Sequence, residues 1–176
     1  GVAYPATESA DDIAAAKKVY FGFENPMDNW TWNVAWFSDP VFLGEYPKEG
    51  LEKFKDYLPE ITEEDMQLIH QPLDFMGQNI YNGYMIRCGA DGDPEYVDRA
   101  PGTAKTGTGW PVTPEALYYG IRFLTERYRL PLYITENGMS DLDNISADGQ
   151  VHDRERITFL DAYLGAVQRA INEGEI

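Results

Sequence analysis

Apolar residues recur at helical spacing in two long stretches of the second half of the chain. The first stretch opens with Thr113-Pro114-Glu115, which places a cap, a proline and an acid where a helix begins. Its apolar stripe is Leu117, Ile121, Leu124 and Tyr128. The second stretch runs from Asp153, a plausible cap, to a stop at Gly174, and its stripe is Ile157, Leu160, Leu164, Val167 and Ile171. The pattern predicts two amphipathic helices, the first over about 114–128, each of which buries its stripe.

Two β-favouring runs flank the first of these helices. Residues 74–81 are predicted to form one strand, and Leu132 to Thr135 a second, short and buried strand. Because a helix connects them, the two strands are expected to be parallel. Such near-apolar parallel strands need cover on both faces, and only two complete ones are visible. We therefore expect an α/β fold: one partial domain over residues 1–176 that is a section of a (β/α)8 barrel and incomplete on its own.

Shorter signals divide the rest of the chain. The first expected segments are the end of a strand at 1–5, a helix over 10–21 capped by Ser9, and a helix over about 28–37 that carries Trp32 and Trp36. A loop over 39–47 follows, then a helix that ends at Pro59, and then a helix through Ile69 with the capping box Thr62–Asp65.

The glycine-rich residues 82–112 are expected to be irregular, as a lid or binding loop. Asp91, Asp93 and Glu95 within them suggest either calcium or a solvated turn. The glycine of an EF-hand loop is missing, which favours the turn.

Composition and charge narrow the possible partners. The 176 residues are 43% hydrophobic and 25% charged, as in an ordinary soluble domain. The net charge of −16 argues against binding to nucleic acid or to an anionic membrane surface, whereas a neutral sugar fits it. Cys88 is the only cysteine, so an internal disulfide is impossible and a reducing, cytoplasmic location is expected. No bilayer-length apolar run or signal-peptide pattern occurs, and no cofactor is expected.

Glu136 is the strongest candidate for chemistry. It follows the second predicted strand directly, and α/β sheets and barrels hold their ligands at the carboxyl ends of parallel strands. A carboxylate there is costly unless it has partners or a function. A plain solvated turn is the alternative, because Asn137 and Gly138 both tolerate positive φ. The residues alone leave both interpretations open.

The segment Leu132-Tyr133-Ile134-Thr135-Glu136-Asn137-Gly138-Met139 resembles the nucleophile segment of glycoside hydrolase family 1, the β-glucosidase family. Further segments resemble the same family in the same order: 36–47 its loop after the fifth barrel helix, 74–81 its sixth strand, 108–110 its aglycone-side loop, and 151–153 with the following helix start. The resemblance covers nearly the whole chain. It implies a C-terminal-half section of the barrel, from the end of strand 5 to the helix after strand 7.

The resemblance also implies roles for four residues. Glu136 would be the nucleophile of a retaining β-glycosidase, which forms a covalent glycosyl-enzyme. Tyr81 would donate a hydrogen bond to that carboxylate and keep it ionised and oriented. Asn79, on the same strand face as Tyr81, would contact the sugar or the catalytic groups, and Trp110 would form part of the wall near the leaving group. Structural packing remains an alternative for Tyr81 and for Trp110.

The printed sequence departs from the family in one decisive respect. The family's acid/base lies in a Thr-x-Asn-Glu-Pro segment, which does not occur here, and Phe23-Glu24-Asn25-Pro26 has the wrong residue order to replace it. The resemblance implies a β-glucoside or oligosaccharide substrate. Because the acid/base segment is missing, we expect little or no turnover by the chain alone and a need for a complementary barrel half or for self-association. The alternative is a catalytically inactive half-barrel scaffold or a carbohydrate-binding fragment.

Overall fold

The computed structural model describes residues 1–23 and 33–174. Within it the chain divides into two compact units. The first unit consists of residues 1–4, 75–85 and 96–176, and the second of residues 5–74 and 86–95. The expectation of one partial domain stays a prediction.

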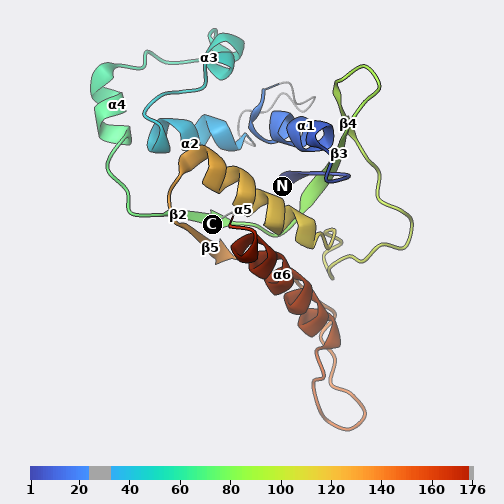
Figure 1. Ribbon diagram of the computed structural model, residues 1–176. Helices are drawn as coiled ribbons and strands as arrows, with labels where there is room; N and C mark the ends of the chain where they lie inside the picture. The colour runs from blue at the N-terminus through green and yellow to red at the C-terminus, as the bar shows by residue number, and fades with distance from the viewer. Residues whose placement is uncertain (24–32, 175–176) are drawn as a thin grey trace. The chain divides into compact units, whose positions relative to one another are not determined.

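Figure 1 shows the helices and short strands of the chain. In order they are β1 (Val2–Pro5), α1 (Ala10–Phe21), α2 (Val34–Phe42), α3 (Lys48–Phe54), α4 (Glu63–Ile69), β2 (Met76–Asn79), β3 (Gly83–Cys88), β4 (Pro94–Tyr96), α5 (Pro114–Tyr128), β5 (Leu132–Glu136) and α6 (Arg154–Asn172). The strands form a sheet of order β1-β3-β4 and a separate pair, β2-β5. None of the helices in the described residues is long and apolar enough to cross a membrane.

The first unit is built on the predicted parallel pair. β2 and β5 pair in parallel, with Met76 opposite Leu132 and Gln78 opposite Ile134. The connecting helix α5 has the predicted bounds, and all four residues of its predicted stripe are buried. Gly120 permits close packing on this helix, because a Cβ there would lie 3.0 Å from Ile80 and 3.1 Å from Val2. The parallel pair and its crossover helix are thus confirmed.

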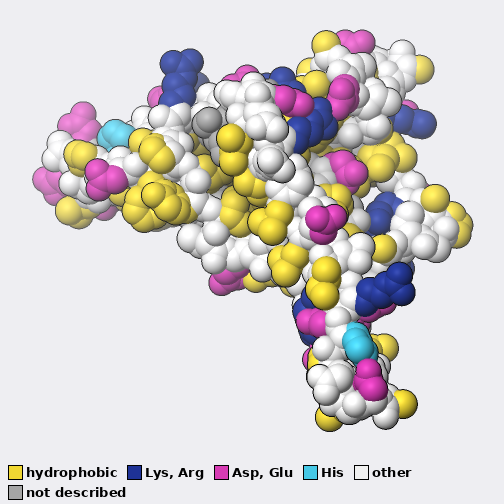
Figure 2. All heavy atoms as spheres, turned by 60° about the horizontal axis from the view of Figure 1, so that its bottom comes forward, with side chains coloured by type: hydrophobic (Ala, Val, Ile, Leu, Met, Phe, Trp, Pro, Cys, Tyr) yellow, Lys and Arg dark blue, Asp and Glu magenta, His cyan; other side chains and the backbone are white. Residues whose placement is uncertain are grey.

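α6 packs against α5, but not through the predicted stripe. Ile157, Leu160, Leu164 and Ile171 are 62%, 45%, 64% and 55% exposed, so the expectation that this stripe is buried was wrong. The buried residues are Phe159, Tyr163 and Ala170, which lie on a neighbouring face of the same helix. That face is buried because the Tyr163 hydroxyl has hydrogen-bond partners in the interior. Its ring also stacks on Phe159, with ring centroids 3.9 Å apart. The aliphatic stripe is left at the surface, where Figure 2 shows hydrophobic side chains in several places.

The predicted N-caps of α5 and α6 were both wrong, because neither Thr113 nor Asp153 makes a side-chain cap bond. The Thr113 side chain makes no cap bond, because its hydroxyl accepts a hydrogen bond from the Gly83 N–H at 3.0 Å instead. Asp153 has a left-handed backbone, and its carboxylate pairs with Arg156 at 2.7 Å. The stop is confirmed, since α6 ends at Asn172 and Gly174, after the C-cap Glu173, has a φ of +74°.

The second unit contains the four shorter helices. Ser9 caps α1, and the capping box of Thr62 and Asp65 begins α4, both as predicted. The predicted loop over 39–47 was wrong at its start, because α2 continues to Phe42 with Pro40 inside it. Trp36 and Pro40, one turn apart, are both buried, and this packing outweighs the proline. The predicted helix start at 28 and Trp32, as well as Glu24, lie outside the described residues.

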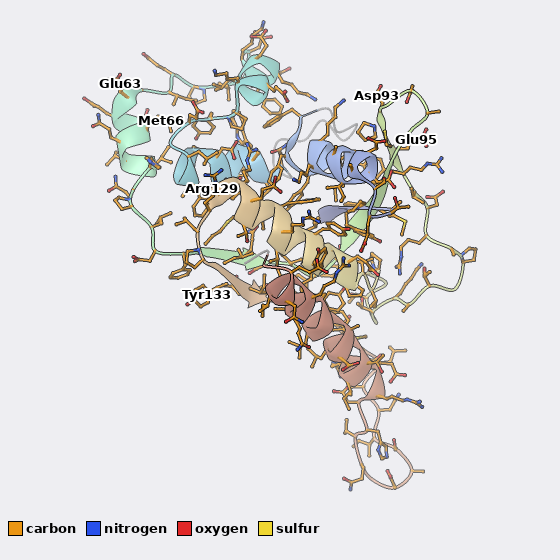
Figure 3. All side chains as sticks on the ribbon, in the orientation of Figure 1. Glu63, Met66, Asp93, Glu95, Arg129 and Tyr133 are labelled. Carbon is orange, nitrogen blue, oxygen red and sulfur yellow. The ribbon has the colours of Figure 1, made fainter. Side chains whose placement is uncertain are left out.

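The stretch 82–112 was expected to be irregular, yet it contains β3 and β4. Their connection is a polar turn in which the Gly89 N–H donates to the Asp93 carbonyl at 2.7 Å. Arg87 and Glu95 pair at 2.6 Å. The Asp91 carboxylate accepts from the Asp93 N–H at 3.1 Å, as in an ordinary solvated turn, and Figure 3 labels Asp93 and Glu95. The sequence did not reveal these strands because glycines, and Pro94 at the start of β4, interrupt the apolar alternation.

Candidate active site

Tyr81 and Glu136 meet at the carboxyl ends of the parallel pair. The Tyr81 hydroxyl donates a hydrogen bond of 2.6 Å to Oε2 of Glu136. Glu136 is the last residue of β5, and Tyr81 follows β2 by two residues. The hydrogen bond, then partial burial and the charge of the carboxylate raise the pKa of the Tyr81 phenol above its ordinary value. A phenol and a carboxylate therefore share a hydrogen bond at this edge of the sheet.

A break in the strand register brings Glu136 to this position. Asn79 lies opposite Glu136 and not opposite Thr135, because the register shifts between Gln78 and Asn79. Strand side chains normally alternate between faces, so Thr135 and Glu136 would point to opposite sides. Both instead reach groups on β2 and its continuation: the Thr135 hydroxyl donates to Asn79 Oδ1 at 2.6 Å, and Glu136 accepts from Tyr81. Bulges of this kind redirect side chains next to active sites.

The face of the strand pair that carries these groups is open to solvent. Tyr133 is 61% exposed and Phe75 is 52% exposed, with their ring centroids 4.9 Å apart. Figure 3 shows Tyr133 on the side of β5 that faces away from α5. The prediction that Leu132 to Thr135 form a buried strand was thus wrong for this chain. α5 packs against the strand pair, whereas Thr135 and Glu136 are exposed.

Trp110 lies beside Tyr81, with ring centroids 5.7 Å apart at an edge-to-face angle of 70°. The indole is 51% exposed, so one side of it is available to a ligand. Its backbone is fixed by the buried Thr106, whose Oγ1 accepts from the Trp110 N–H at 3.1 Å. The same loop is tied to the segment after Glu136, since the Gly107 N–H donates to the Ser140 carbonyl at 2.8 Å. The aromatic wall and the carboxylate are therefore held by one connected set of loops.

The structure thus brings Asn79, Tyr81, Trp110 and Glu136 to one edge of the sheet. Their chemical roles stay predictions. Two further residues of this edge were not singled out by sequence reasoning. Thr135 holds the Asn79 amide, and Asn137 donates from Nδ2 to the Ile80 carbonyl at 2.8 Å. The available signal was their place directly on either side of Glu136, but their partners depend on the bulge.

Comparisons with known proteins agree on one family. The sequence model described as Glycosyl hydrolase family 1 matches residues 1–175. Beta-glucosidase A of Thermotoga maritima is 36% identical over 173 residues, which are 97% of this chain and 36% of that protein. A 1,4-beta-D-glucan glucohydrolase of Thermotoga neapolitana is 37% identical over 97% of this chain and 38% of its own length. The chain thus spans a little over a third of the curated relatives it matches.

Solved structures give the same result for the fold. The Thermotoga maritima β-glucosidase in complex with glucoimidazole has a TM-score of 0.72 and 36% identity, over 97% of this chain and 36% of that one. These relatives are (β/α)8 barrel enzymes, and the chain is an α/β section of such a barrel without its closure, as predicted. The match over nearly every residue and the agreement in both sequence and structure show that the chain belongs to glycosyl hydrolase family 1.

Proposed function

We propose that Glu136 is the nucleophile of a retaining β-glycosidase, and that this chain supplies the nucleophile half of its barrel. One observation carries the proposal: the 2.6 Å hydrogen bond from the Tyr81 phenol to the Glu136 carboxylate at the carboxyl ends of adjacent parallel strands. This edge is where barrel enzymes place their catalytic groups. A carboxylate is the nucleophile that such chemistry needs, because it attacks as an anion and leaves again in the second step.

The reaction then proceeds in two displacements. A carboxylate oxygen of Glu136 forms a bond to the anomeric carbon while the bond from that carbon to the leaving oxygen breaks. The leaving oxygen takes its proton from an acid carboxyl, which we assign to another part of the barrel. Water then attacks the anomeric carbon, gives its proton to the same carboxyl, and frees Glu136. Tyr81 occupies Oε2 throughout the first step, so the other oxygen is the one that attacks.

Asn79 and Trp110 would contact the substrate. Asn79 lies opposite Glu136, and its carboxamide oxygen accepts from Thr135, so its NH2 group can donate to a sugar hydroxyl. The half-exposed Trp110 ring offers an apolar surface beside Tyr81 for a sugar or an aglycone. The names of the relatives, β-glucosidase and 1,4-beta-D-glucan glucohydrolase, support a β-linked glucose as the substrate class.

We further propose that the site needs a complementary part of the barrel for turnover. The printed sequence holds no Thr-x-Asn-Glu-Pro segment, and a general acid contributes about 10²–10⁴-fold to such a reaction. The exposed aliphatic stripe of α6 and the open face of the strand pair support the existence of further contacts. We expect the chain by itself to release no product from an ordinary alkyl glycoside.

The proposal is tested with a reagent that does not need the acid. A 2-fluoro glycosyl fluoride has a good leaving group, and its glycosyl-enzyme breaks down slowly enough to be seen by intact-mass analysis. We expect the chain to gain the mass of one glycosyl group, the Glu136→Gln variant to gain none, and the matched variant Glu126→Gln, on α5, to react like the parent chain. Equal labelling of Glu136→Gln would overturn the proposal. Sugar binding without labelling would identify a carbohydrate-binding fragment instead.

A further inference from the structure

Side chains add to the strand bonds that hold the backbone next to Tyr81, where the Val2 N–H of β1 also donates to the Asn82 carbonyl at 3.1 Å. β2 ends at Asn79, and the last bond of its ladder runs from the Ile80 N–H to the Glu136 carbonyl at 3.0 Å. Beyond it, the Ile80 carbonyl accepts from Asn137 at 2.8 Å and the Tyr81 carbonyl accepts from the Tyr163 hydroxyl at 2.8 Å. Two residues later the Gly83 N–H donates to Thr113 at 3.0 Å. We call Asn137, Tyr163 and Thr113 the backbone clamp.

Tyr163 is the central member of the backbone clamp. Its hydroxyl donates to the Tyr81 carbonyl and accepts from the Thr113 N–H at 2.9 Å, so both roles of the group are used. The side chain is 1% exposed, and its ring stacks on Phe159. A buried hydroxyl cannot exchange these partners for water, and each is costly to leave unsatisfied. Tyr163 therefore fixes the Tyr81 backbone from the interior of the protein.

The chain beyond Tyr81 has little room to compensate for a displacement. A Cβ at Gly83 would lie 2.1 Å from the Val2 carbonyl oxygen and 2.8 Å from Ala116. The backbone thus passes between β1 and α5 in close contact with both. A shift at Tyr81 must accordingly be taken up on the open side, where the phenol meets Glu136.

We propose that Tyr163 is a positioning residue that directs the Tyr81 phenol toward Glu136 by holding the Tyr81 carbonyl. It touches neither substrate nor nucleophile in this role. The inference rests on the proposed function only for its catalytic meaning, because the clamp and its geometry do not depend on the reaction.

The experiment removes the Tyr163 hydroxyl oxygen in the Tyr163→Phe variant and measures the pKa of the Tyr81 phenol. The full chain is labelled with [13Cζ]tyrosine, the Tyr81 signal is assigned from its loss in Tyr81→Phe, and its pKa is measured by NMR. In the parent chain the pKa should lie above the ordinary tyrosine value of about 10, because the phenol donates to a carboxylate. In Tyr163→Phe it should fall toward that ordinary value, because the shortened side chain no longer holds the Tyr81 carbonyl.

The chain offers a matched control. Tyr118 on α5 is 2% exposed, and its hydroxyl donates to Glu173 at the other end of α6. Tyr118→Phe thus also removes a buried hydroxyl that links α5 to α6. It should leave the Tyr81 pKa unchanged. A loss of the Tyr81 shift in both variants would mark a general loosening of the helix pair and would overturn the proposal.

A second pair of variants covers the case in which Tyr163→Phe fails to fold. Thr113→Val removes the hydroxyl that accepts from Gly83, whereas Thr113→Ser keeps it. We expect Thr113→Val to lower the Tyr81 pKa and Thr113→Ser to retain the parent value. A folded Tyr163→Phe or Thr113→Val chain in which Tyr81 titrates as in the parent would refute the role of the clamp.

The labelling rate separates this inference from the proposed function. With the 2-fluoro glycosyl fluoride, Tyr163→Phe should react about 10- to 100-fold more slowly than the parent, as expected for a displaced catalytic group. If the parent chain is not labelled but Tyr163→Phe still lowers the Tyr81 pKa, the proposed function fails and the positioning role stands. If the parent is labelled and Tyr163→Phe changes neither quantity, the positioning role fails and the function stands.

Discussion

At the scale of single residues, the site depends on the hydrogen bond that the Tyr81 phenol donates to the Glu136 carboxylate. Tyr81 holds its proton more firmly than a free tyrosine does, so it remains a donor to Glu136 at every physiological pH. Donation to one oxygen of the carboxylate fixes its plane and leaves the second oxygen for attack. The bulge at Thr135 is what makes this geometry possible, because it turns Glu136 to the face that bears Asn79 and Tyr81.

Removal of the Tyr81 hydroxyl should therefore slow glycosylation without preventing it. We expect Tyr81→Phe to be labelled at Glu136 about 10- to 100-fold more slowly than the parent chain, since the nucleophile remains but is less well oriented. The time course of the mass increase measures this rate. Tyr84→Phe, which changes a 52% exposed tyrosine on β3, is the control and should react at the parent rate. Equal rates for Tyr81→Phe and Tyr84→Phe would show that the hydrogen bond has no kinetic role.

The sequence was informative about this site wherever the signal is local. Glu136 is recognisable because it ends an apolar run, whereas Tyr81 and Asn79 were assigned through the resemblance to glycoside hydrolase family 1. The partners Thr135 and Asn137 were not predictable in the same way. Their contacts arise from a register shift between two strands more than 50 residues apart in the chain, and no local pattern encodes such a shift.

At the scale of elements, α6 packs against α5 and carries Tyr163, whose hydroxyl donates to the Tyr81 carbonyl. α5 followed its sequence pattern closely in its bounds and its buried stripe, although the Thr113 side chain does not cap it. α6 carries two apolar faces, one aliphatic and one with Phe159 and Tyr163, and periodicity alone cannot decide between them. The aromatic face was buried because Tyr163 has polar partners in the interior. β3 and β4 were hidden for another reason, because glycines and Pro94 interrupt their apolar alternation.

The buried Tyr118 phenol should make the stability of the folded chain depend on pH in the alkaline range. Burial, followed by the hydrogen bond to Glu173, raises its pKa to about 12. A raised pKa in the folded state means that the contribution to stability is fully present below about pH 10 and is lost as the pH rises toward 12. Urea unfolding of the parent and of Tyr118→Phe at pH 8 to 11.5 should show a smaller alkaline loss in the variant. Parallel stability curves would contradict the assignment of this loss to Tyr118.

At the scale of the whole molecule, the chain is a barrel section with apolar surface left uncovered. Leu164 of α6 is 64% exposed and Tyr133 of β5 is 61% exposed, although α6 buries Phe159 and Tyr163 on another face. The fold class was predictable from the alternation of strands and helices, and the comparisons confirmed it. The surfaces that remain exposed were not predictable. A hydrophobic pattern shows which residues can be buried, but it does not show whether another part of the protein covers them.

The aliphatic stripe of α6 should make the isolated chain associate with itself. We expect sedimentation velocity to show an average mass that rises with concentration. Leu164→Glu should weaken this association about tenfold or more, because burial of a leucine contributes roughly 1.5–3 kcal/mol. Leu68→Glu, which changes a 78% exposed leucine on α4, serves as the control and should have little effect. A parent chain that stays monomeric at all concentrations would contradict the prediction.

The most direct test of the central claim is to locate the label in the chain. After reaction with the 2-fluoro glycosyl fluoride, the chain is digested and the modified peptide is sequenced by tandem mass spectrometry. The account predicts a single glycosyl group on Glu136, in the peptide that contains Ile134 to Gly138. A label on another carboxylate, or none under conditions that label the β-glucosidase of Thermotoga maritima, would contradict the assignment of Glu136 as the nucleophile that this chain presents.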